Sequence, residues 1–400
     1  MRLNGNPYFI RGAAGRQYPD ELFESGGNSI RSYVETSQDL DTAQRYGLTV
    51  LVGIPMAQAG GGFRYDNPEA VAKQLSGIRE TVRRHRDHPS LLMWALGDEP
   101  ELRVSGAERV RLWRAIEEAA RAVKQEDPNH PVITVIAGTD DGKVKEVAEF
   151  CPSLDALGIN AFEKAATVPD ALAEQGWNKA YVLTEYGPRS HREVETTLWG
   201  APIEDDSTTK ARLYLSSYQA AVEGKPNCLG SYAYLWGSKH VRTSTWYSMF
   251  LSTGSPTGAV DVVRFLWTGS WPVNRAPEIG PQGLQIALEG LRADTGLRQF
   301  PPGATIHCSV DADDPEGDPV IVAWEVRPDI AALETPPSNP EDPGADPAPP
   351  IEGLVQLSEL YRAVIRVPGK PGHYRVFAYV RDSKGSAATV SAPIAVTGTL

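Results

Sequence analysis

Two carboxylates end the apolar run Leu91-Leu92-Met93-Trp94-Ala95-Leu96-Gly97-Asp98-Glu99. A second run of the same form, Ala180-Tyr181-Val182-Leu183-Thr184-Glu185-Tyr186-Gly187, carries one carboxylate near its end. Short apolar runs of this kind are typical of parallel strands that are buried on both faces. The carboxyl ends of such strands meet at the face of a sheet where active sites are built. We therefore expect Glu99 and Glu185 to lie on one functional face.

The first two thirds of the chain alternate between apolar runs and helical patterns. The predicted strands are Tyr8–Ala13, Ser29–Tyr33, Thr49–Met56, Leu91–Leu96, Val132–Ala137, Asp155–Asn160, Ala180–Thr184 and Leu229–Leu235. The predicted helices are Asp39–Tyr46, Pro68–His85, Ala107–Glu126, Lys143–Phe150, Asp170–Glu174, Thr209–Glu223 and Gly258–Trp267, with barely one turn near Asp20–Glu24. Eight such units over this length predict right-handed crossovers and a closed (β/α)8 TIM barrel.

The pattern changes after about residue 270. Five alternating runs follow, separated by Pro, Gly and Asp turns: Ala304–Val310, Val320–Val326, Tyr361–Val367, Tyr374–Arg381 and Ala388–Val396. They predict a small all-β sandwich, antiparallel and immunoglobulin-like in size. Residues 335–350 contain seven prolines and are predicted to form a loop. The predicted domains are a barrel over 1–272 and an accessory sandwich over 273–400, joined by the linker Trp271–Pro277.

Composition excludes several classes of partner. The net charge of -12 argues against a nucleic-acid partner, because phosphate binding needs clustered Lys and Arg. No apolar stretch of the 400 residues approaches the roughly 20 needed for a membrane span. The three cysteines are expected to be buried thiols. Residues 1–7 hold no signal segment, and we expect the chain to begin within a larger precursor.

The paired glutamates point to glycoside hydrolysis. One carboxyl group must be protonated to release the leaving oxygen, while the other must be ionised to attack the anomeric carbon. The alternative is that each glutamate is a solvated residue just past a strand. The pattern favours a retaining glycosidase.

Four segments resemble glycoside hydrolase family 2. Asn4–Gly12 and Ser29–Tyr33 are similar to the first two strands of its barrel. His88–Pro100 resembles the fourth-strand segment with the acid/base, and Leu183–Gly187 resembles the seventh-strand nucleophile segment. The resemblance covers residues 1–270 and extends to clan A of the glycosidases, although the usual amino-terminal sandwich domains are missing from this chain. Residues 311–318 resemble PKD-type or cadherin-like modules.

The resemblance implies roles for individual residues. Glu99 would be the acid/base and Glu185 the nucleophile, with Arg31 beside the nucleophile to hold it ionised. Trp236, after the last strand, would form the floor of the sugar site. The alternatives are a purely structural ion pair for Arg31 and ordinary packing for Trp236.

The sequence departs from the clan at two positions. Asp98 stands where the clan usually has asparagine, and an ionised carboxylate must accept from a sugar hydroxyl or pair with a cation. Its charge would also raise the pKa of Glu99. Phe162 stands where some members place a tyrosine against the nucleophile, a contact that Tyr186 or Tyr234 would take over. The expected substrate-binding residues are Arg31, Asp98, Asn160, Tyr186 and Trp236.

We expect no cofactor and no metal. The glycines at 60–62 are consecutive and form no phosphate-binding fingerprint. The acidic residues of 311–318 would suit Ca²⁺, but an Asp/Gly turn between strands is the favoured interpretation.

The predicted protein is a secreted or periplasmic retaining β-glycoside hydrolase. The alternatives are a non-catalytic carbohydrate-binding protein on this scaffold and a transglycosylase. The sugar, the linkage, endo or exo action and the oligomeric state stay open.

Overall fold

The computed structural model describes residues 1–34, 37–58, 62–291, 296, 298–329 and 348–398. The chain forms two compact units. One comprises Met1–Gly187 with Ser216–Trp236, and the other comprises Pro188–Leu215 with Gly237–Leu400. Most of the predicted loop at 335–350 lies outside the described residues, which resume at 348. The predicted division at residue 272 stays a prediction.

The first unit contains a closed barrel of eight parallel strands, preceded by a short hairpin of β1 (Arg2–Leu3) and β2 (Asn6–Pro7). The barrel strands are β3 (Ile10–Ala14), β4 (Ser29–Ser32), β5 (Thr49–Ile54), β6 (Leu91–Asp98), β7 (Val132–Ala137), β8 (Ala156–Asn160), β9 (Ala180–Tyr186) and β10 (Cys228–Tyr234). The barrel closes where β10 pairs with β3, with Gly230 opposite Ile10. The predicted TIM barrel is confirmed.

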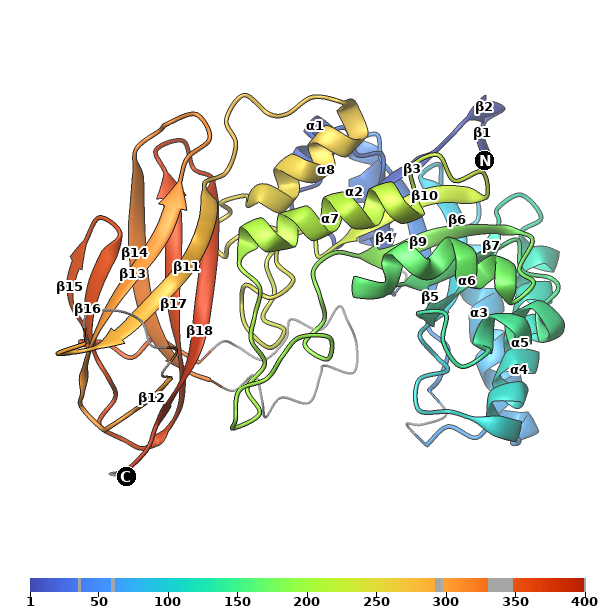
Figure 1. Cartoon of the computed structure of the whole chain (residues 1–400). Helices are drawn as coiled ribbons and strands as arrows, with labels where there is room; N and C mark the ends of the chain where they lie inside the picture. The colour runs from blue at the N-terminus through green and yellow to red at the C-terminus, as the bar shows by residue number, and fades with distance from the viewer. Residues whose placement is uncertain (35–36, 59–61, 292–295, 297, 330–347, 399–400) are drawn as a thin grey trace. The chain divides into compact units, whose positions relative to one another are not determined.

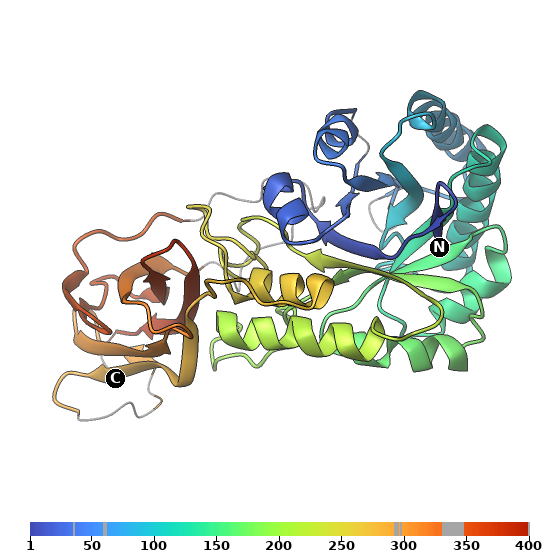
Figure 2. The ribbon, with the colours of Figure 1, turned by 90° about the horizontal axis from the view of Figure 1, so that it is seen from above.

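Helices alternate with these strands, as predicted (Figure 1). They are α1 (Pro19–Glu24), α2 (Ser37–Arg45), α3 (Pro68–His85), α4 (Gly106–Glu126), α5 (Lys143–Phe150), η2 (Glu163–Thr167), α6 (Val168–Glu174), α7 (Ser207–Ala221) and α8 (Gly258–Thr268). Local sequence sets their ends: in α3 the Asn67 side chain accepts from the backbone N–H groups of Glu69 and Ala70. In the view of Figure 2, α3 to α6 form an outer layer around the strands.

The second unit ends in two four-stranded sheets. One has the order β11 (Glu278–Leu288), β13 (Thr305–Asp313), β16 (Arg362–Arg366) and β15 (Val355–Glu359). The other has the order β12 (Gln299–Phe300), β18 (Ala387–Val396), β17 (Gly372–Asp382) and β14 (Val320–Pro328). Ile306 and Ile365 of the first sheet share a buried apolar cluster with Val376 and Ile394 of the second. The predicted antiparallel β-structure is confirmed, although β12 pairs with β18 in parallel. The immunoglobulin-like or PKD identity stays a prediction.

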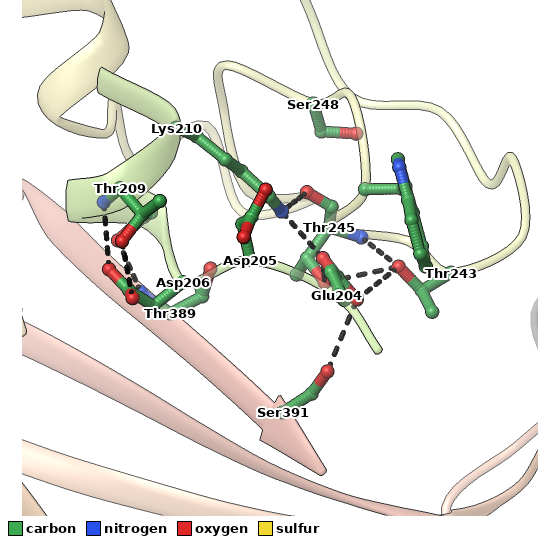
Figure 3. Close-up of polar contacts among 12 residues, drawn as sticks. Glu204, Asp205, Asp206, Thr209, Lys210, Thr243, Thr245, Ser248, Thr389 and Ser391 are labelled. Carbon is green, nitrogen blue, oxygen red and sulfur yellow. Dashed lines mark hydrogen bonds and ion pairs between the residues drawn. The ribbon is translucent and has the colours of Figure 1, made fainter. Parts of the chain in front are cut away.

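A buried polar cluster lies in the second unit, centred on Glu204 (Figure 3). One carboxylate oxygen accepts from the Lys210 ammonium at 2.6 Å and the Thr245 hydroxyl at 2.8 Å. The other accepts from the hydroxyls of Thr243 at 2.8 Å and Ser391 at 3.1 Å. The cluster therefore joins the segment after β9, the segment after β10 and strand β18. A buried charge of this kind requires such partners.

Two further expectations concern membranes and metals. No described helix is long and apolar enough to cross a membrane. Asp314 Oδ1 accepts from the backbone N–H groups of Glu316 and Asp318, so residues 314–318 form a hydrogen-bonded turn. Among the described residues, no three His, Cys, Asp or Glu side chains are grouped so as to hold a metal ion.

Candidate active site

The two predicted glutamates lie at the carboxyl ends of their strands. Glu99 directly follows β6, and Glu185 is the penultimate residue of β9. Both strands are buried over nearly their whole length, as their apolar sequences predict. Both glutamates therefore lie on the face of the barrel where active sites are built.

Glu185 is held by two donors from the end of β4. Arg31 Nη1 donates to Glu185 Oε1 at 2.8 Å, and the Tyr33 hydroxyl donates to the same oxygen at 2.6 Å. Arg31 also donates to the Thr184 carbonyl at 2.9 Å, and its guanidinium lies 4.3 Å from the Tyr33 ring centre. Residues two apart on a strand share a face, which explains why Arg31 and Tyr33 reach the same carboxylate. Both donors favour the ionised form of Glu185.

Glu99 has a different partner. Asn160 Nδ2, at the end of β8, donates to Glu99 Oε1 at 3.0 Å. The Asn160 oxygen accepts from Arg31 Nη1 at 3.1 Å and from the Thr184 hydroxyl at 2.8 Å. These two donors fix the amide so that its NH2 group faces Glu99. Asn160 and Arg31 therefore link the two glutamates through one hydrogen-bonded chain.

Asp98 pairs with a cation. An ionised carboxylate at this position was expected either to do so or to accept from a sugar hydroxyl. Arg31 Nη2 lies 2.5 Å from Asp98 Oδ1, and Asn160 Nδ2 donates to the same oxygen at 3.1 Å. The Asp98 side chain keeps 21% of its surface exposed, whereas that of Arg31 keeps 2%. Arg31 thus shares its single charge between Asp98 and Glu185.

These surroundings shift the pKa values of the site. Burial raises the pKa of Glu99 to about 8, and the charges of Asp98 and Glu185 also raise it. Burial raises the pKa of Glu185 to about 7, whereas Arg31 lowers it. Burial also raises the pKa of the Tyr33 hydroxyl well above its usual value, so that it remains a donor. The Arg31 pKa is lowered by burial but raised overall by Tyr33, Asp98 and Glu185.

The surroundings of Glu99 therefore favour its protonated form more strongly than those of Glu185 do. The Glu99 carboxyl group receives one amide donor, whereas the Glu185 carboxylate receives a guanidinium and a phenol. Two carboxyl groups with pKa values pushed apart by their environments can divide the roles of acid and base. The arrangement suits transfer of a proton by Glu99 and nucleophilic attack by Glu185.

Two expected site residues have buried rings. Tyr186 follows Glu185 on β9, so its side chain takes the opposite face; its ring is fully buried, 6.3 Å from that of Tyr218 on α7. Trp236 is 1% exposed, and its indole N–H donates to the Tyr18 carbonyl at 3.1 Å. The predicted contacts of these two rings with a substrate stay predictions.

Tyr33 contacts Glu185, and it was not among the residues predicted for the site. The signal was its place two residues after Arg31, on the same face of the strand. Phe162 lies with its ring edge-to-face with Tyr234, at 5.9 Å between ring centres.

The fold is a closed (β/α)8 barrel, and two neighbouring glutamates lie at the carboxyl ends of its strands. Residues 24–194 match the model of the glycosyl hydrolases family 2 TIM barrel domain. The chain thus carries the TIM-barrel domain of glycoside hydrolase family 2 and is a homologue of those enzymes.

Curated relatives agree with this assignment. A β-glucuronidase from Mus musculus is 28% identical over 121 residues, covering 24% of this chain and 18% of the relative. A β-glucuronidase from Bacteroides fragilis is 30% identical over 132 residues, covering 32% of this chain and 18% of the relative. This chain spans less than one fifth of the length of either relative.

Solved structures share the fold. A Bacteroides uniformis β-glucuronidase matches with a TM-score of 0.52 and 16% identity, covering 100% of this chain and 47% of that chain. A β-galacturonidase from Eisenbergiella tayi, bound to galacturonate, matches with a TM-score of 0.51 and 18% identity. The match covers 67% of this chain and 52% of that chain. At this identity the likeness shows the fold alone.

Proposed function

We propose that this protein is a retaining β-glycoside hydrolase that acts through Glu99 and Glu185. The observation that carries the proposal is the contrast between the two glutamates. Burial raises the pKa of both, but Glu185 accepts from Arg31 and Tyr33, which favour its ionised form, whereas Glu99 accepts from the neutral Asn160 amide.

The mechanism follows from these two protonation states. The Glu185 carboxylate attacks the anomeric carbon as the bond to the leaving oxygen breaks, and Glu99 gives its proton to that oxygen. A covalent glycosyl ester on Glu185 results. Glu99, now ionised, takes a proton from water, whose oxygen attacks the anomeric carbon and releases Glu185. Arg31 and Tyr33 stabilise Glu185 each time it leaves as a carboxylate.

The proposed substrate is a β-linked oligo- or polysaccharide. Asp98, as a carboxylate, accepts hydrogen bonds, so the group that meets it must be a donor such as a hydroxyl. Because the curated relatives are named β-glucuronidases, β-glucuronides are the first substrates to test. We further propose a secreted or periplasmic location.

The test compares two variants on aryl β-glycosides and oligosaccharides. Glu185→Ala should abolish turnover of every substrate, because no nucleophile remains. Glu99→Ala should spare substrates with good leaving groups, and added azide should restore its turnover, because only proton transfer has been removed. NMR of the first product should show the β-anomer.

Three outcomes count against the proposal. Azide rescue of Glu185→Ala alone would exchange the two roles. An α-anomer as the first product would contradict retention. Glycan binding by the unmutated chain without any turnover would favour a carbohydrate-binding protein.

A further inference from the structure

The turn after β6 holds Glu99 in an unusual backbone conformation. Glu99 has a φ of 48°, in the left-handed region that residues with a side chain rarely adopt. Its N–H donates to the Val135 carbonyl on β7 at 3.0 Å, and its carbonyl accepts from the Leu102 N–H at 3.1 Å. Such a conformation persists only where surrounding contacts hold it. The contacts between this turn and β7 therefore bear on the position of the Glu99 carboxyl.

One of these contacts is a buried ion pair. The Glu101 side chain, two residues after Glu99, is 2% exposed, and that of Lys143 is 9% exposed. Glu101 Oε1 accepts from the Ala137 N–H at 2.8 Å and from Lys143 Nζ at 3.3 Å. Lys143 Nζ also donates to the Ala137 carbonyl at 2.5 Å. The pair thus binds both backbone groups of the last residue of β7.

Ala137 connects this pair to the partner of Glu99. In the register between β7 and β8, Ala137 lies opposite Asn160. The Gly138 N–H donates to the Asn160 carbonyl at 2.8 Å, and Asn160 Nδ2 donates to Glu99 Oε1 at 3.0 Å. The turn that carries Glu99 and the strand that carries Asn160 are therefore both fixed to the same point.

We propose that Glu101 and Lys143 form a positioning pair that holds the Glu99 carboxyl against Asn160 for proton transfer. The inference rests on the acid/base role proposed above for Glu99. Neither member of the pair touches the reacting atoms, because both act through Ala137 and the turn. The charge of Glu101 additionally raises the pKa of Glu99, which favours the protonated acid.

A positioning role has a signature that a general loss of structure lacks. Proton transfer by Glu99 matters most when the leaving group is a poor one, and least when it leaves unaided. Misplacement of the acid by about 1 Å should therefore cost about 100-fold for poor leaving groups alone. A weakened fold would reduce the turnover of all substrates by the same factor.

The variants must keep the barrel folded. Removing one member of the pair leaves the other as a buried unpaired charge, which is strongly destabilising. The double variant Glu101→Gln with Lys143→Met removes both charges and keeps similar volumes. The matched control is Glu117→Gln on α4, because the buried Glu117 carboxylate likewise accepts a backbone N–H, that of Ser153, at 2.9 Å. Ser153 precedes β8, at the amino end of the barrel.

The assay is kcat/KM for a series of aryl β-glycosides of one sugar. The double variant should lose about 100-fold on phenyl glycosides and less than about threefold on dinitrophenyl glycosides, because only the former need the acid. For Glu117→Gln, any loss of kcat/KM should be the same on phenyl glycosides as on dinitrophenyl glycosides. An equal loss across the series, or no loss at all, would overturn the inference. Failure of the proposed function would appear earlier, as absent turnover by the unmutated chain, and would overturn both.

Discussion

Replacing Asp98 with asparagine should move the pH–activity profile of hydrolysis to lower pH. Asp98 lies beside both glutamates, and its charge raises the pKa of each. Asparagine keeps the oxygen that accepts from Arg31 and Asn160, so the substitution removes a charge and preserves those two contacts. The experiment therefore isolates the electrostatic effect of the residue that departs most from the clan.

The size of the shift follows from the geometry around Asn160. Its Nδ2 lies 3.1 Å from Asp98 Oδ1 and 3.0 Å from Glu99 Oε1, which places these oxygens roughly 5 Å apart. Two unit charges at that distance repel by about 3 kcal/mol at an effective dielectric constant of 20, or about 2 pKa units. Arg31 lies against Asp98 and neutralises part of its charge. We therefore expect the pKa of Glu99 to fall by about one unit.

The assay is kcat/KM against pH, which reports the groups of the free enzyme. Ionisation of Glu185, with a pKa of about 7, sets the acidic limb, and loss of the Glu99 proton, with a pKa of about 8, sets the basic limb. Removing a negative charge makes both carboxyls ionise more readily, so both limbs should move to lower pH. Asp155→Asn, just before β8 at the amino end of the barrel, is the charge-matched control. An unchanged profile, or one displaced to higher pH, would refute the reasoning.

Two further predictions concern the nucleophile and the barrel. Tyr33→Phe removes the 2.6 Å hydrogen bond to Glu185, so kcat should fall roughly 10- to 100-fold. Because that bond lowers the pKa of Glu185, the acidic limb of the pH–activity profile should move to higher pH, as pH-dependent kinetics would show. Gly230→Ala should destabilise the barrel in urea unfolding, since its Cβ would lie 2.0 Å from the Ile10 carbonyl oxygen and its φ is +124°. Gly77→Ala in α3 meets nothing within 4 Å and should instead stabilise by roughly 0.5–1 kcal/mol; the opposite order would contradict both assignments.

The barrel and its two glutamates were predictable because their signals are local. Each strand is a short apolar run, and helices such as α3 have an amphipathic pattern and a capping residue, Asn67. Glu99 and Glu185 are 86 positions apart in the sequence, yet closure of a barrel brings the carboxyl ends of all strands to one face. Topology thus places them together without any direct signal between them.

Side-chain direction at the strand ends was harder to predict. The pairing of β8 with β9 shifts between Ile159 and Asn160, so Glu185 comes to lie opposite Asn160. Register shifts of this kind determine which residue of the neighbouring strand faces the site, and no local sequence pattern predicts them.

Strand β11 was missed for a related reason. Gly280, Pro281 and Gly283 interrupt its alternation, and the structure accommodates them by a register shift between Ile279 and Leu284. Glycine and proline inside a strand are ordinarily signs of a break, and here they mark an irregular stretch of the ladder.

The Glu204 cluster shows what a domain boundary read from sequence leaves out. Glu204 and Ser391 are 187 residues apart, and neither stands in a motif, so no local pattern predicts their contact. Burial raises the pKa of Glu204, but Lys210 and Arg375 lower it overall, so the carboxylate remains charged in the interior. A buried charge cannot lose its partners without a large cost, which binds these segments into one unit. Glu204 lies in the segment that follows β9, the strand of Glu185, and Ser391 lies in β18. The segment around Glu204 therefore belongs to the same unit as the C-terminal sheets, although it precedes the predicted boundary at residue 272.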